Sequence, residues 1–317
     1  MRSLTRRAIR VAGITLWAAG LGVLANGQSI GSEPRVAIIP RMAPLPAEES
    51  PHSTFRMDVK LIQIPVTVTD MRDQPVMGIP KDHFKLFEDD VEQQIVTFSM
   101  ADAPVSTGLV FDSSGSMRDR IEDSRAAVHQ FFETAGPGDE FSLVRFSDKA
   151  ELISGFTHDI GRISESLASI HARGWTAMID GICLSLGEMH HASHPRRVLL
   201  VLSDGGDNNS RYSQSELLSI LREASVRVFA IGLFDRPRYL EKLADETGGH
   251  VIWIRKLSDL PDAMDKLSLQ IRNEYMVGYF SDHALNDGKY HKVRVEVQPP
   301  TTMKQVRTSW RRGYIAP

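Results

Sequence analysis

The chain has 317 residues, of which 42% are hydrophobic and 24% are charged, a balance typical of a folded protein long enough for two domains. Its net charge of −3 and isoelectric point near 6.4 argue against a nucleic-acid partner. Cys183 is the only cysteine, so the chain can form no internal disulfide.

The first 27 residues have the pattern of a secretory signal peptide. An apolar run, Val11–Ala25, is short for a membrane span and is followed by small residues at a position suited to cleavage. Before this run the segment carries four arginines and no acidic residue: Arg2, Arg6, Arg7 and Arg10. We therefore expect an exported protein, periplasmic or secreted, that loses residues 1–27. The alternative is an uncleaved membrane anchor.

Residues 28–53 contain five prolines and few large apolar side chains, which predicts a linker. Residues 54–102 are expected to be all-β. Apolar side chains at every second position from Ile62 to Val68 predict a strand, and Pro65 within it indicates an edge position or a bulge. Two further strands are expected around an acidic turn, at 84–87 and 95–98.

Residues 103–273 alternate strands with helices. The uncharged run Val105–Phe111 and the very hydrophobic Val198–Leu202 predict strands that are buried on both faces. Further strands are expected at 141–146, 150–155, 226–233 and 250–254. Helices are expected at 121–132, 161–170, 177–190, 215–224, 237–247 and 257–272. This alternation predicts an α/β domain with a doubly wound, mostly parallel sheet.

Residues 274–317 return to period-two alternation, with strands expected at 275–280, 292–297 and 305–310. A sequence with β segments on both sides of one α/β unit suggests that the unit is inserted. We expect 54–102 and 274–317 to pair into a single β-sandwich that carries the α/β domain. Two separate β modules are the alternative, although each would have few strands.

Acidic and hydroxyl side chains follow two of the buried strands and precede one helix. Asp112, Ser114 and Ser116 form an Asp-x-Ser-x-Ser pattern after the first strand, Thr176 precedes a helix, and Asp204 follows the Val198–Leu202 strand. Ligands of doubly wound sheets bind at the carboxyl ends of the strands, where such loops can converge. The alternative for the first loop is a helix N-cap, which would leave Asp204 unexplained.

These three elements resemble the metal-ion-dependent adhesion site of von Willebrand factor A-type domains, in the family's order and over residues 103–273. The resemblance implies direct metal contacts from the hydroxyls of Ser114, Ser116 and Thr176. It also implies that Asp112 and Asp204 act through bound water or as weak direct ligands. A departure is Trp175, where many members have glycine. The whole chain further resembles exported von Willebrand-A-related proteins of soil bacteria of the acidobacterial type, with a closing Gly313-Tyr314.

Oxygen ligands of low charge suit a hard cation, Mg²⁺ or in its place Mn²⁺, and disfavour zinc and copper. If neutral hydroxyls make the direct contacts, the ion stays electron-poor and attracts a further anionic ligand, such as a carboxylate of a partner protein. Asp180, one turn after Thr176, could accept a hydrogen bond from a metal-bound water or could be a surface acid.

We therefore expect an exported, non-enzymatic binding protein whose partner is another protein, with no nucleic-acid partner and with a membrane contact only if the N-terminus stays uncleaved. Metal-assisted hydrolysis is one alternative, but no histidine except His171 lies near the three loops to act as a general base. A passive structural role in an envelope assembly is the other.

Overall fold

The computed structural model describes residues 61–101, 103–234, 238–281, 287–299 and 305–316. The predicted signal peptide (1–27) and the predicted linker (28–53) lie outside these ranges. None of the helices within them is long and apolar enough to cross a membrane.

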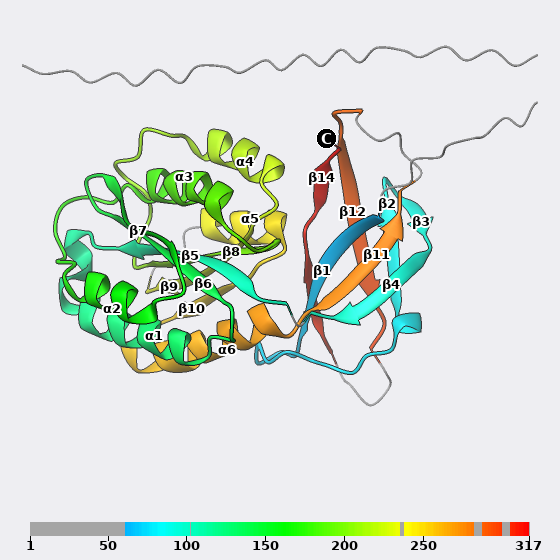
Figure 1. Cartoon of the computed structure of the whole chain (residues 1–317), viewed down its shortest axis with the longest axis horizontal. Helices are drawn as coiled ribbons and strands as arrows, with labels where there is room; N and C mark the ends of the chain where they lie inside the picture. Colours follow the sequence, from blue (N-terminus) through cyan, green and yellow to red (C-terminus); the bar gives the residue numbers. More distant parts are fainter. Residues whose placement is uncertain (1–60, 102, 235–237, 282–286, 300–304, 317) are drawn as a thin grey trace, which may run out of the picture. The chain divides into compact units, whose positions relative to one another are not determined.

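The centre of the α/β domain is a six-stranded sheet with the order β10-β9-β8-β5-β6-β7 (Figure 1). Its strands are β5 (Val105–Asp112), β6 (Glu140–Phe146), β7 (Ala150–Thr157), β8 (Arg196–Ser203), β9 (Arg227–Leu233) and β10 (Val251–Ile254). All neighbours run parallel except β7, which lies antiparallel to β6 at the edge. Every side chain of β5 is buried, as expected for a strand covered on both faces.

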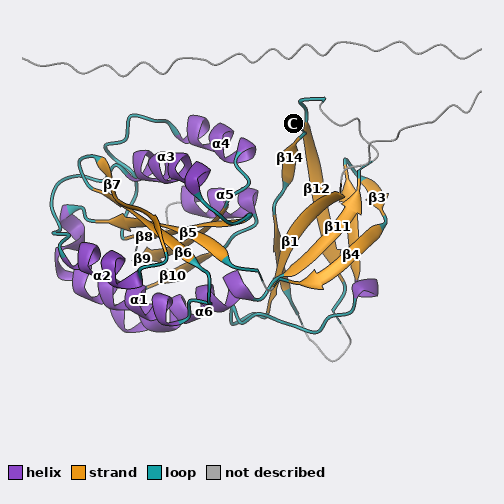
Figure 2. Cartoon of the chain, in the orientation of Figure 1, coloured by secondary structure: helices purple, strands orange, loops and turns teal. Residues whose placement is uncertain are grey.

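Helices cover both faces of this sheet (Figure 2). They are α1 (Ile121–Glu133), α2 (Ile160–Ala168), α3 (Met178–Glu188), α4 (Gln214–Glu223), α5 (Arg238–Thr247) and α6 (Leu260–Arg272). Helices α1, α2 and α6 share one hydrophobic core with the sheet, and α3, α4 and α5 share the other. The doubly wound arrangement predicted from the strand–helix alternation is confirmed.

The two β segments together form a sandwich of two four-stranded sheets, β13-β1-β11-β4 and β14-β12-β2-β3. The N-terminal strands are β1 (Leu61–Thr69), β2 (Phe84–Glu88), β3 (Val91–Gln93) and β4 (Ile95–Met100). The C-terminal strands are β11 (Tyr275–Phe280), β12 (Tyr290–Val297), β13 (Arg307–Trp310) and β14 (Gly313–Ile315). Side chains from both segments fill one core, so the predicted fold class, an α/β domain inserted between paired β segments, is confirmed.

Two local features differ from or refine the expectation. The last strand expected, 305–310, is not the final one, because β14 follows and pairs with β12. This strand is too short to show a period, and it depends on Gly313, where a Cβ would lie 2.3 Å from the carbonyl oxygen of His291.

Pro65 lies in β1 where only β11 pairs with it, since β13 pairs with β1 from Val66 onward. Pro65 thus has a neighbouring strand on one side only, a position that suits a residue with no N–H to donate.

The junction between sandwich and α/β domain is built around a buried charge cluster. The guanidinium of Arg227 donates to Glu274, to Oγ1 of Thr67 at 2.7 Å and to the carbonyl of Gly248 at 2.8 Å. Arg196 donates to the other oxygen of Glu274 at 3.0 Å. Burial, with Arg196 as a second cause, lowers the pKa of Arg227 to about 9. Side chains of both domains therefore meet in one hydrogen-bonded network.

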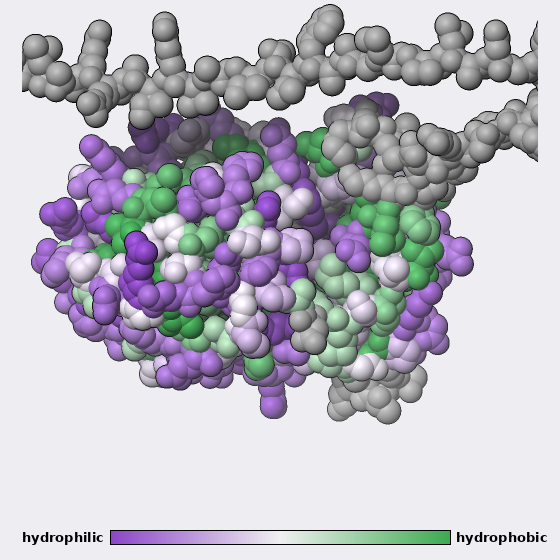
Figure 3. All heavy atoms as spheres, in the orientation of Figure 1, coloured by the Kyte–Doolittle hydropathy of each residue, from purple (hydrophilic) through white to green (hydrophobic). Residues whose placement is uncertain are grey.

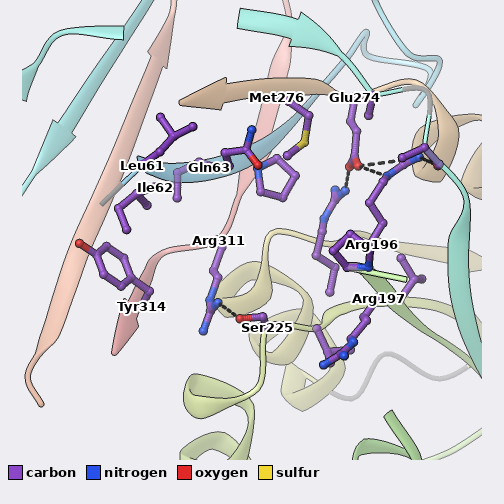
Figure 4. Close-up of a pocket in the computed structure, with 18 of the residues that line it drawn as sticks. Leu61, Ile62, Gln63, Arg196, Arg197, Ser225, Glu274, Met276, Arg311 and Tyr314 are labelled. Carbon is purple, nitrogen blue, oxygen red and sulfur yellow. Dashed lines mark hydrogen bonds and ion pairs between the residues drawn. The ribbon is translucent and has the colours of Figure 1, made fainter. Parts of the chain in front are cut away.

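Next to this cluster is a cavity of about 550 Å³, lined by β1, by the first residues of β8 and β9, and by Arg311 and Tyr314 (Figure 4). It lies at the amino ends of the parallel strands, opposite the edge where Asp112 and Asp204 were expected to meet. On the face shown in Figure 3, hydrophilic residues predominate over the α/β domain, and more of the sandwich surface is hydrophobic or intermediate.

Residues 54–102 are not expected to fold without residues 274–317. In the sandwich, β11 lies between β1 and β4, and β12 lies next to β2, so the N-terminal strands have few partners among themselves. The expected result for the isolated 54–102 fragment is a non-cooperative thermal profile by circular dichroism. A cooperative melt of that fragment would show that the shared sandwich is not needed for its folding.

Candidate metal centre

Three loops meet at the carboxyl edge of the parallel sheet. The first loop (113–119) follows β5, the second loop (170–177) precedes α3, and the third loop (204–213) follows β8. Backbone hydrogen bonds join them: Gly115 N–H donates to Gly174 O at 2.9 Å, and Asn208 N–H donates to Thr176 O at 3.0 Å. The convergence of three loops predicted from the sequence is therefore present.

Asp112 ends β5 at the bottom of this convergence and is fully buried. Its Oδ1 accepts from the N–H of Ser114 at 2.8 Å, and its Oδ2 accepts from the hydroxyl of Ser203 at 2.6 Å. Burial raises the pKa of Asp112 to about 6, since a desolvated carboxylate is costly, and these hydrogen bonds offset part of the effect. A carboxylate held in this state gains from a nearby cation. Ser203, which orients it, was not among the predicted site residues.

Ser114, Ser116 and Asp204 form a continuous chain of oxygen atoms above Asp112. The hydroxyls of Ser114 and Ser116 are 3.0 Å apart, and the hydroxyl of Ser116 donates to Oδ1 of Asp204 at 2.8 Å. Ser114 and Asp204 are buried, whereas Ser116 is exposed, so water can reach this row of oxygen atoms at Ser116. The N-cap alternative does not account for them, because Ser114 makes no side-chain capping bond to the short helix that it precedes.

Thr176 enters from the second loop and is buried. Its N–H donates to Oδ1 of Asn208 at 2.9 Å, and Gly174, two residues earlier, accepts from the first loop. The backbone of Thr176 is thus bonded to the third loop, and Gly174 joins the second loop to the first. Trp175, the departure from the family pattern, is 64% exposed.

Asp180 is buried, so it is not a surface acid. Its Oδ1 accepts from the N–H groups of Arg211 and Tyr212 at 2.9 and 3.1 Å, and its Oδ2 accepts from the Arg211 side chain at 3.1 Å. Asp207 similarly accepts from the N–H of Ile179 at 3.1 Å. These two carboxylates fix the third loop against the start of α3, and the loop in turn fixes Thr176.

Arg120, a residue that the sequence did not single out, completes the surroundings of Asp204. Its guanidinium forms an ion pair with Oδ2 of Asp204, the oxygen that Ser116 leaves free. The same guanidinium lies over the ring of Phe234, with 4.3 Å between its carbon and the ring centroid. The arginine comes from the N-terminus of α1 and Phe234 from the end of β9, so only the fold brings them together.

The oxygen chain fits a small hard cation. Ligands of an octahedral Mg²⁺ at about 2.1 Å lie about 3 Å from one another, close to the Ser114–Ser116 oxygen separation of 3.0 Å. In the described ranges no group of three or more His, Cys, Asp or Glu side chains is placed to hold a metal ion. The oxygen atoms that the structure brings together at this edge belong to hydroxyls and carboxylates, the donor types that hard cations prefer.

Residues 107–206 match the family model of the von Willebrand factor type A domain. Among curated proteins, the chain is similar to inter-alpha-trypsin inhibitor heavy chain H4. The Sus scrofa protein is 28% identical over 186 residues, which are 54% of this chain and 20% of that protein. The Homo sapiens protein is 24% identical over 202 residues, 58% of this chain and 22% of that protein. The chain thus spans about a fifth of the length of these relatives.

Among solved structures, a von Willebrand factor type A protein from Catenulispora acidiphila has a TM-score of 0.49 and 14% identity, covering 83% of this chain and 74% of that chain. Proximal thread matrix protein 1 of the mussel byssus, with a zinc-occupied metal-ion-dependent adhesion site, has a TM-score of 0.47 and 20% identity. It covers 58% of this chain and 49% of that chain.

The region that the family model matches begins in β5 and ends in the third loop. It therefore contains the whole candidate donor set, and it lies within the doubly wound sheet that such domains share. The chain carries a von Willebrand factor type A domain.

Proposed function

We propose that this chain is an exported, non-enzymatic binding protein in which a Mg²⁺-type ion captures an acidic group of a partner protein. The observation that supports it most directly is the oxygen chain of Ser114, Ser116 and Asp204 above the buried carboxylate of Asp112. Thr176 would complete the donor set from the second loop. Export rests on the signal-peptide pattern of residues 1–27.

The composition of the donor set explains why such a site binds a ligand. Three of the five candidate donors are neutral hydroxyls, so two carboxylates supply all the negative charge. A divalent cation there would supply electrostatic attraction for a further anion. Ser116 lies on the exposed side, so a partner's carboxylate can approach from water along that side.

The arrangement gives hydrolysis little support. His171, the histidine nearest to the donor set in sequence, is exposed, and its ring nitrogen Nδ1 is bonded to the backbone carbonyl of Ser169 at 2.8 Å. Metal-assisted hydrolysis needs a base within hydrogen-bond reach of the attacking water. Binding needs an open position beside the ion and no base, so it is the simpler use of these residues.

The test uses Mn²⁺ as a paramagnetic probe of the mature protein. Bound Mn²⁺ should enhance water proton relaxation, and succinate should reduce that enhancement by replacing a bound water. Succinamide, of similar size but uncharged, should leave the enhancement unchanged, and EDTA should abolish it. Equal effects of the two small molecules would contradict capture of an anion. Mn²⁺-dependent hydrolysis of p-nitrophenyl phosphate would contradict the non-enzymatic assignment.

A further inference from the structure

Arg120 places a positive charge directly beside the proposed metal site. Its guanidinium pairs with Oδ2 of Asp204, whose carboxylate is almost completely buried, while Ser116 occupies Oδ1. Both oxygens of Asp204 are thus engaged, one by a neutral hydroxyl and one by a cation. The side chain of Arg120 is 30% exposed, so solvent reaches part of it.

The position of Arg120 is held on its other side by Phe234. The guanidinium carbon lies 4.3 Å from the ring centroid, a distance at which a cation interacts favourably with an aromatic face. Phe234 has a φ of +72°, a left-handed conformation that is costly for a bulky side chain, and its N–H donates to Ile254 O at 2.9 Å. Strained residues persist where the surrounding structure imposes them, often at binding sites.

Charge determines what Arg120 does there. Asp112 and Asp204 contribute two negative charges and Arg120 contributes one positive charge. A divalent cation would leave these groups with a net positive charge of one, and without Arg120 the same groups would be neutral. The positive charge of Arg120 therefore repels the metal ion and attracts an anion that binds after the metal.

We propose that Arg120 is the specificity-determining residue of this site, lowering its affinity for the metal and raising the affinity of the metal-loaded site for a carboxylate. The proposal rests on the proposed function, because it assumes that the metal and the acid bind at this edge. It predicts that removing the charge of Arg120 strengthens metal binding and weakens carboxylate binding. A purely structural role of Arg120 would instead weaken both binding steps.

The experiment measures Mn²⁺ binding by electron paramagnetic resonance, and then succinate binding to the Mn²⁺-loaded protein by water proton relaxation. We expect Arg120→Gln to bind Mn²⁺ about tenfold more tightly and succinate about tenfold more weakly than wild type. Arg120→Lys keeps the charge and should stay within about threefold of wild type in both. Arg118→Gln removes the same charge from an exposed position of the first loop and is the matched control.

Each outcome decides between the alternatives. Mn²⁺ affinity that is unchanged or lower in Arg120→Gln would overturn the role of Arg120, while the proposed metal site would stand on the wild-type titration. Equal effects of Arg118→Gln and Arg120→Gln would also overturn it, since net charge alone would then account for the change. Wild-type protein that binds no Mn²⁺ would overturn both the proposed function and this inference.

Discussion

Asp112→Asn is expected to weaken Mn²⁺ binding by about 100-fold or more while leaving the chain folded. The substitution removes the negative charge at the bottom of the three loops but keeps the shape of the side chain. An asparagine can still accept from the N–H of Ser114 with its oxygen and can donate to the hydroxyl of Ser203 with its amide. The loop conformation should therefore survive the loss of charge.

Equilibrium dialysis against Mn²⁺ measures this effect, with circular dichroism to verify the fold. Asp207→Asn is the matched control, because Asp207 lies in the third loop and accepts from the N–H of Ile179 rather than from the oxygen chain. Its Mn²⁺ affinity should change far less than that of Asp112→Asn. Wild-type affinity in Asp112→Asn would refute the assignment of the site.

Without metal, the difference in stability between wild type and Asp112→Asn should depend on pH. The pKa of Asp112 is raised from about 4 to about 6 in the folded state, so the protonated form favours folding. Relative to Asp112→Asn, metal-free wild type should therefore lose stability as pH rises from about 4 to about 6, by ~3 kcal/mol in total. Below about pH 4 the difference should be constant. Urea unfolding of metal-stripped protein across this range measures it.

Arg227→Met is expected to lower the free energy of unfolding by about 3 kcal/mol. Arg227 is fully buried at the junction and binds Glu274, Thr67 and the backbone of Gly248. Its removal leaves the buried Glu274 with Arg196 as its remaining cationic partner. It also leaves the carbonyl of Gly248 and the hydroxyl of Thr67 without this donor, and unsatisfied buried polar groups are costly.

Urea denaturation at neutral pH measures this loss. Arg307→Met is the matched control, because Arg307 pairs with Asp73 at 3.0 Å but its side chain is 50% exposed. An exposed pair contributes less than about 1 kcal/mol, so the control should be nearly as stable as wild type. Equal losses in the two variants would show that the buried network does not hold the junction together.

Local patterns in the sequence were sufficient to predict most of the regular elements of this fold. The fully buried run of β5 and the alternation in β1 are visible in the residues themselves, because burial on two faces or on one sets the spacing of apolar side chains. Strands β3 and β14 were missed because three residues are too few to show a period. The pairing of β14 with β12 depends on the close backbone approach at Gly313.

The meeting of the candidate donors at one edge was predictable for a different reason. Asp112, Ser114 and Ser116 lie within five residues, and the topology of parallel strands requires the loops that carry Thr176 and Asp204 to reach the same edge. The charged residues around the set were not predictable. Arg120 reaches Asp204 across 84 positions, and Arg227 reaches Thr67 across 160, and no local pattern marks either pair.

The most direct test of the central claim is the melting temperature of the mature protein in EDTA and then with Mg²⁺ or Mn²⁺, alongside Asp112→Asn. A ligand that binds only the folded state must raise the melting temperature. We expect both ions to raise it in wild type and neither to raise it in the variant. An absence of any shift in wild type would contradict a metal site at this edge and would favour a structural role for the domain. An equal shift in both proteins would place the metal elsewhere.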